Sequence, residues 1–185
     1  MNYTTLASIT DIDGIFDILN SHDHIYGHRI DEIKIKLKNL INQILNREIS
    51  GCIILHYEDN QITGLGIARF FQNVWVISLV LMKWKDYNIK NQIHGGHIFA
   101  SLVQQAEQRG LKEFYWAARE EKSSKYNRLK IVLEQSDILD RYEIYTIEKL
   151  EPYTTSKHEL INQGVLCDLA GKNKKPIAIR KAVLK

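Results

Sequence analysis

The segment at residues 92–97, Gln-Ile-His-Gly-Gly-His, constrains this chain more than any other, because it stands between two apolar strands and opens onto a helix. Residues 74–82 and 113–118 are predicted strands, and residues 98–111 have the apolar spacing of a helix that stops at a glycine. The glycine pair therefore predicts a turn that opens this helix. Since such a turn bares N–H groups at the positive end of the helix dipole, it predicts a site for phosphate groups.

Two common phosphate-binding motifs do not fit this segment. Gly95 and Gly96 lack the G-x-G-x-x-G spacing of a dinucleotide site, and no Gly-Lys-Ser/Thr follows them as in a Walker A loop. A plain glycine loop without a ligand remains the alternative.

The spacing instead resembles the acyl-CoA loop of the GNAT superfamily of N-acyltransferases, whose pattern is Gln/Arg-x-x-Gly-x-Gly/Ala at the N-terminus of the central helix. Gln92 and Gly95 match this pattern, whereas His97 stands where the family has a small residue. A histidine there would either crowd the pyrophosphate or add a hydrogen-bond donor beside it. The resemblance implies that acetyl-CoA or another acyl-CoA binds at Leu81, Met82, Lys83, Gln92, Ile93, His94, Gly95, Gly96, His97 and Ile98.

Hydrophobic periodicity predicts the remaining elements. Strands are expected over residues 2–9, 51–57, 61–71, 141–147 and 177–184, and helices over residues 11–19, 29–46 and 123–135. The resulting order, β-α-α-β-β-β-α-β-α-β-β, is that of the GNAT fold. The segment 151–175 fits this order poorly and is interpreted as an insertion.

The resemblance implies an α/β (α+β) fold in which helices flank a central sheet that is mixed and mostly antiparallel. It also implies that the fourth strand, ending at residues 81–83, splays from the fifth strand at residues 113–118. The pantetheine arm of the cofactor would then pair with the exposed strand edge as an added strand does.

Length and composition predict one intracellular domain. A chain of 185 residues is long enough for one core and too short for two ordinary domains. Cys52 and Cys167 form no C-x-x-C motif, which favours a reducing compartment. No secretory signal and no apolar stretch of about 18 residues is visible, so the expected location is the cytoplasm, away from membranes. The net charge of +3 permits an anionic partner without requiring one, and a homodimer is left open.

Direct acyl transfer needs a base for the attacking amine and an acid for the leaving thiolate, and the resemblance implies a tyrosine as the acid. The family pattern Asn-x-x-Ala-x-x-x-Tyr-x-x-x-Gly-Phe aligns best with residues 126–138, which puts Leu133 at the tyrosine. Leucine cannot donate a proton, so Tyr126, the nearest hydroxyl on the same predicted helix, becomes the candidate acid. The alternatives are another donor, an unassisted thiolate or no transfer at all, with Tyr126 an ordinary helical tyrosine.

Glu120 is the candidate base, with Glu121 beside it and Asp86 as a further candidate. The alternative is that residues 120–122 form a solvated helix start, where acidic residues suit the dipole. The three histidines of residues 21–28 would border the acceptor cleft of the resembled fold, although a polar loop is the simpler interpretation.

Basic and aromatic residues favour a second hypothesis, an enzyme that modifies a nucleic acid or an aminoacyl-tRNA. Trp84 and Tyr87 lie among lysines in the loop before the glycine pair, where they can stack on a nucleotide. The tail is basic through Lys172, Lys174, Lys175, Arg180, Lys181 and Lys185. An exposed charged face explains both features as well.

The leading hypothesis is an acyl-CoA-dependent N-acyltransferase that acetylates an amine by direct attack in a ternary complex. The departures at His97 and Leu133 support a third hypothesis, a GNAT-like binding protein without transfer activity.

Overall fold

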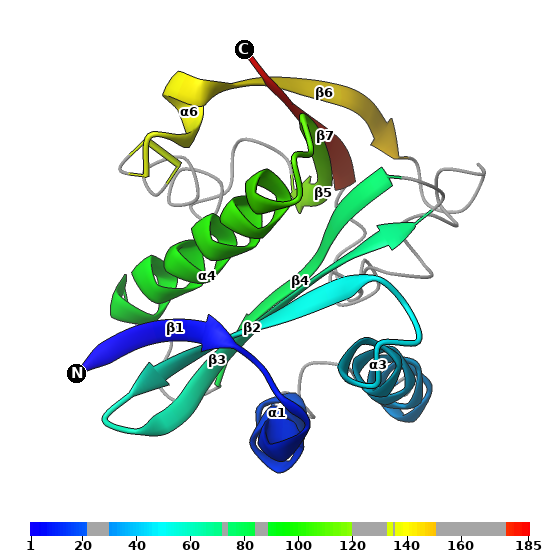
Figure 1. Ribbon diagram of the computed structural model, residues 1–185, viewed down its shortest axis with the longest axis vertical. Helices are drawn as coiled ribbons and strands as arrows, with labels where there is room; N and C mark the ends of the chain where they lie inside the picture. Colours follow the sequence, from blue (N-terminus) through cyan, green and yellow to red (C-terminus); the bar gives the residue numbers. More distant parts are fainter. Residues whose placement is uncertain (22–29, 72–73, 84–88, 120–132, 135, 151–176) are drawn as a thin grey trace.

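The structure, a computed structural model, describes residues 1–21, 30–71, 74–83, 89–119, 133–134, 136–150 and 177–185. Its strands are β1 (Asn2–Leu6), β2 (Gly51–Glu58), β3 (Gln61–Phe71), β4 (Val74–Met82), β5 (Glu113–Arg119), β6 (Tyr142–Leu150) and β7 (Ile177–Leu184). The helices within these residues are η1 (Ile9–Asp11), α1 (Ile12–Asn20), α3 (Ile30–Leu45), α4 (Ile89–Gln108) and α6 (Ile138–Arg141). The seven strands form one sheet in the order β1-β2-β3-β4-β5-β7-β6 (Figure 1).

Neighbouring strands of this sheet are antiparallel except for β4 and β5, which are parallel and are joined through α4. The predicted mixed, mostly antiparallel sheet is therefore confirmed. The predicted bounds of β3, β4 and β7 are confirmed to the residue. Of the helix predicted at residues 123–135, only residues 133 and 134 are described, and both are helical.

Helices cover both faces of the sheet (Figure 1). On one face, α4 contributes Ile98 and Leu102 to a buried cluster that also contains Ile77 of β4. On the opposite face, α1 and α3 pack on a second cluster, which includes Ile15 and Ile41. Among the described helices, none is both long enough and apolar enough to cross a membrane.

The glycine pair does not open α4, so the predicted turn is wrong. The helix begins at Ile89, and both glycines lie inside its second turn. Glycine costs a helix interior about 1 kcal/mol relative to alanine. However, His94, Ile98 and Leu102 form one buried stripe that continues past the glycines, and its packing on the sheet offsets this cost. The N–H groups without an intrahelical partner are therefore those of residues 89–92.

Two glycines of β3 bring the sheet close to α4. A Cβ atom built at Gly66 would lie 2.3 Å from Ile98 Cγ2 and 2.8 Å from Leu102 Cδ1. At Gly64 the nearest atoms would be Met82 Sδ, at 2.5 Å, and Ile98 Cδ1, at 2.8 Å. Both strand positions therefore depend on the missing side chain for the close approach of the helix.

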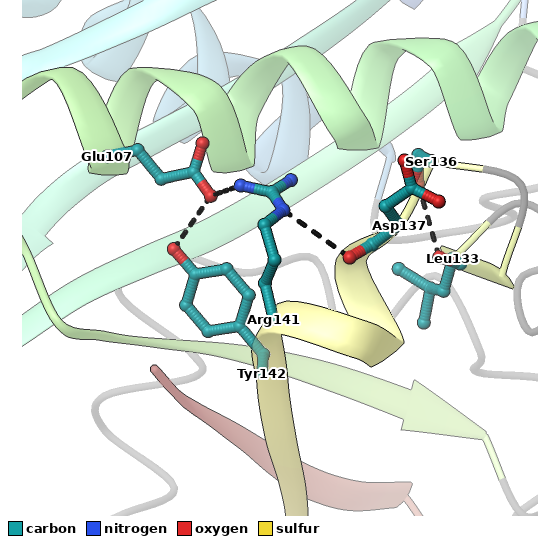
Figure 2. Close-up of polar contacts among 6 residues, drawn as sticks. All are labelled: Glu107, Leu133, Ser136, Asp137, Arg141 and Tyr142. Carbon is teal, nitrogen blue, oxygen red and sulfur yellow. Dashed lines mark hydrogen bonds and ion pairs between the residues drawn. The ribbon is translucent and has the colours of Figure 1, made fainter. Parts of the chain in front are cut away.

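A polar cluster ties the last turns of α4 to the start of β6 (Figure 2). Glu107 Oε1 accepts a hydrogen bond from Tyr142 OH at 3.0 Å and forms an ion pair with Arg141 Nη1. Arg141 Nε also donates to Asp137 O at 3.3 Å. Burial, followed by the bond to the Glu107 carboxylate, raises the pKa of Tyr142 to about 12.

The raised pKa of Tyr142 predicts a loss of stability at high pH. An unfolded tyrosine ionises near pH 10, whereas folded Tyr142 keeps its proton to about pH 12. Its contribution is complete below pH 10 and is lost as the pH rises towards 12, because the unfolded state then binds fewer protons than the folded state. We expect the free energy of unfolding, measured by urea denaturation, to fall less steeply over this interval in Tyr142→Phe. Equal slopes for the two proteins would contradict the expectation.

Candidate functional site

The sheet opens between its two parallel strands, as predicted. The ladder between β4 and β5 has two register pairs, Val76 with Tyr115 and Ile77 with Trp116. Strand β4 nevertheless continues to Met82, and β5 continues to residue 119. From Ser78 onward, the edge of β4 that faces β5 has no strand partner among the described residues, so its backbone groups can bind an extended ligand.

A β-bulge lies where the two strands part. Ala68 of β3 is opposite Ile77 and Ile67 is opposite Leu79, so Ser78 is an extra residue in β4. Bulges bend a strand and re-aim side chains, and they are common next to active sites. The bulge and the end of the β4–β5 ladder coincide to within one residue.

The bulge shifts the alternation of side chains along β4. Trp75 and Ile77 before it, and Val80 and Met82 after it, all pack on the cluster under α4, although strict alternation would put the two pairs on opposite faces. Side chains two residues apart lie on the same face of a strand, so Ser78 shares with Val80 the face that α4 covers.

Ser78 is the feature of this site that sequence reasoning missed. Ser78 is only 4% exposed, and its Oγ has no hydrogen-bond partner within the described part of the chain. Leaving a buried polar group unpaired costs about 1–3 kcal/mol, so a ligand atom that bonds to this hydroxyl would recover that cost. The one signal in the sequence is a hydroxyl residue in an otherwise apolar run.

The N-terminal half of α4 covers the open end of β4. A Cβ atom built at Gly95 would lie 3.8 Å from Val80 Cγ1 and 3.9 Å from Met82 Cγ. At the end of the strand, Lys83 N donates to Thr63 O at 2.6 Å and extends the pairing with β3. The second turn of α4, which contains Gly95, therefore lies over the part of β4 whose edge towards β5 has no strand partner among the described residues.

The predicted cofactor residues within α4 point in different directions. Ile93 is 42% exposed and His97 is also exposed, whereas His94 and Ile98 are buried. The His94 ring lies against that of His56, with centroids 4.3 Å apart, inside the contact between helix and sheet. The side chain of Gln92 is not described.

The predicted catalytic residues lie mostly outside the described residues. These are Tyr126, Glu120, Glu121 and Asp86, together with the histidines of residues 22–28. Leu133, which stands at the tyrosine of the family pattern, is 4% exposed and belongs to the cluster under α4; its carbonyl accepts a bond from Ser136 Oγ at 3.4 Å (Figure 2).

The described part of the basic tail is engaged in the fold. Arg180 is 5% exposed, Lys181 Nζ lies 2.7 Å from Glu113 Oε2, and Lys185 Nζ donates to Leu139 O at 2.9 Å. These contacts weaken the charge argument for a nucleic-acid partner. The other residues of that argument, Trp84, Tyr87, Lys172, Lys174 and Lys175, lie outside the described residues.

No family model matches the sequence, and no curated protein matches it significantly. The structure is nevertheless similar to solved N-acetyltransferases. An acetyltransferase of the GNAT family from Bacillus cereus has 15% identity and a TM-score of 0.55, with 99% of this chain and 97% of that chain covered. The ribosomal-protein-alanine N-acetyltransferase from Brucella melitensis has 13% identity and a TM-score of 0.60, with 98% and 99% covered.

A third similar structure is the PaiA N-acetyltransferase from Thermoplasma acidophilum in complex with coenzyme A. It has 12% identity and a TM-score of 0.54, with 97% of this chain and 98% of that chain covered. Likeness at these identities shows the architecture. The chain therefore has the GNAT fold, in a divergent form.

Proposed function

We propose that this chain is an acyl-CoA-dependent N-acyltransferase that transfers an acyl group, by direct attack, to an amine. The observation that carries the proposal is the opening of the sheet beside the bulge at Ser78. There a strand edge and a buried hydroxyl lie together, and neither has a partner among the residues that the structure describes. An extended ligand with amides and a carbonyl oxygen matches these groups.

Two parts of the cofactor, the pantetheine arm and the pyrophosphate, match groups of the protein. The free edge of β4 pairs with the amides of the pantetheine arm, along residues 78–82. The N–H groups of residues 89–92, which have no acceptor within the helix, bind the pyrophosphate. Gln92 of this turn also matches the family pattern. We therefore keep the proposal that acyl-CoA binds along the residues from Gln92 to Ile98, but we place its pyrophosphate nearer the first turn of α4.

Positioning the amine against the acyl group supplies much of the rate in such a reaction. Glu120 remains the predicted base, and Tyr126 remains the predicted acid for the thiolate, because buried Leu133 cannot donate a proton. Acetyl-CoA is the simplest acyl donor for this site.

Isothermal titration with acetyl-CoA tests the proposal directly. We expect one molecule to bind per chain, followed by turnover with at least one member of a panel of small amines and peptides with free N-termini. Release of the CoA thiol, measured with a thiol reagent, reports turnover. A folded protein that does not bind acetyl-CoA would remove the proposal.

Binding without turnover across the whole panel would instead support the GNAT-like binding protein. His97, an exposed residue in place of a small one, is the observation that favours this second function. His97→Gly separates the two: restored turnover would identify the histidine as the obstacle.

A further inference from the structure

We infer that Ser78 is a catalytic residue whose hydroxyl donates a hydrogen bond to the acyl carbonyl oxygen of the bound thioester. The inference rests on the proposed function and assigns one contact within it. Ser78 is 4% exposed, its Oγ has no partner among the described residues, and it is the extra residue of the β4 bulge.

The position of Ser78 in β4 favours a contact with the acyl group over a contact with the pantetheine arm. Ser78 is the first residue of β4 beyond the ladder with β5, so it lies at the apex of the opening, and residues 79–82 extend away from it along the free edge. A cofactor arm that pairs with this edge ends at the apex with its acyl group. The hydroxyl therefore meets the one strong acceptor that the acyl group carries.

The hydroxyl acts by stabilising charge and loses no proton. The amine lone pair forms the new C–N bond, and the carbonyl π electrons move to the oxygen, which accepts the bond from Ser78. When this pair returns, the C–S bond breaks and its electrons leave with the thiolate, while the extra proton of the amine passes to the base. A donor aimed at an oxygen that gains charge in this way typically contributes about 10²–10³ in kcat.

Trp116 is the alternative donor at the apex. It pairs with Ile77 in the last rung of the ladder, is 6% exposed, and its Nε1 also lacks a partner in the described part of the chain. Trp75, one residue before the first β4–β5 pair, also has an Nε1 without a partner among the described residues, so an unpaired indole is not specific to the opening. Ser78 is therefore the preferred donor.

The test compares the binding of acetyl-CoA with that of S-ethyl-CoA, a thioether of the same length that lacks the carbonyl oxygen. By calorimetry, the unchanged protein should bind acetyl-CoA about threefold to tenfold more tightly, the usual effect of one neutral hydrogen bond. Ser78→Ala should bring the ratio close to one through a loss of acetyl-CoA affinity alone. Ser78→Thr, which keeps the hydroxyl, should retain the ratio. A merely structural serine would change the affinity for both ligands equally.

Two further variants keep the test decisive. Ser101→Ala removes a hydroxyl that already bonds to Thr4 Oγ1 and His97 O, and it should leave the ratio unchanged. Ser78→Cys preserves the buried volume if the alanine variant does not fold, and its weak S–H donor should lower the ratio. A ratio that persists in folded Ser78→Ala or Ser78→Cys, or one that is lost in Trp116→Phe instead, would overturn the inference. Failure of both ligands to bind the unchanged protein would overturn the proposed function itself.

Discussion

Gly95→Asp is expected to weaken CoA binding by more than tenfold, whereas Gly95→Ala should leave it intact. A Cβ atom at Gly95 makes ordinary contacts with Val80 and Met82, at 3.8 and 3.9 Å, so alanine fits. Aspartate would add a negative charge beside the open end of β4, near the turn where we propose that phosphates bind. Two like charges within about 4–8 Å of each other cost about 2–4 kcal/mol at an effective dielectric constant of about 20, which weakens binding roughly 30-fold to 1,000-fold.

The control for this substitution is Gly95→Asn, which has the size of aspartate without its charge. Calorimetry should show nearly unchanged CoA affinity in the asparagine and alanine variants and a large loss in the aspartate variant. Circular dichroism and thermal melting establish that all three are folded. Unchanged CoA affinity in folded Gly95→Asp would move the anion site away from this end of α4, and equal losses in the aspartate and asparagine variants would make size, not charge, the cause.

Gly66→Ala is expected to lower the free energy of unfolding by about 1–3 kcal/mol, and Gly66→Val should lower it further. The added carbon would lie 2.3 Å from Ile98 Cγ2. This methyl group is attached directly to the Cβ of a β-branched residue, whose side-chain rotation is restricted in a helix. The clash therefore has to be relieved by a shift of α4 away from β3, which weakens the whole contact between helix and sheet.

Gly64→Ala is the matched control in the same strand. Its Cβ atom would meet Met82 Sδ and Ile98 Cδ1, which are the far ends of flexible side chains and can rotate away. Chemical denaturation should therefore show a smaller loss for Gly64→Ala than for Gly66→Ala. Equal losses in the two variants would mean that α4 shifts away from β3 at as little cost as a flexible side chain rotates.

The strands of this protein are more predictable from sequence than the start of its main helix. Strand β4 is a nine-residue run that is apolar except for Ser78 and ends at Met82, and the structure keeps its predicted bounds. The start of α4 is different, because glycines at 95 and 96 indicate a turn locally, while the buried stripe through His94 and Ile98 requires a helix. Local preference is worth about 1 kcal/mol per glycine, and tertiary packing outweighs it.

The candidate site is only partly predictable, because part of it depends on the register between β3 and β4. The opening between β4 and β5 follows from the resemblance to the GNAT fold. The bulge at Ser78 arises because Ile67 is opposite Leu79 while Ala68 is opposite Ile77. This offset between β3 and β4 cannot be deduced from the sequence of either strand alone. Tyr126 and Glu120 stay predictions, because they lie outside the described residues.

Strand β7 lies inside the sheet, between β5 and β6, although it is the last of the seven strands to be synthesised. Residues 113–119 and 142–150 emerge from the ribosome first, and their native partner at residues 177–184 follows later. Strands β1 to β4 each neighbour the next strand in sequence and can pair while translation continues. Until β7 is available, the edges of β5 and β6 with which it pairs stay unpaired. Unpaired strand edges are templates for pairing with other chains. These edges of β5 and β6 therefore stay open to pairing with other chains until residues 177–184 become available.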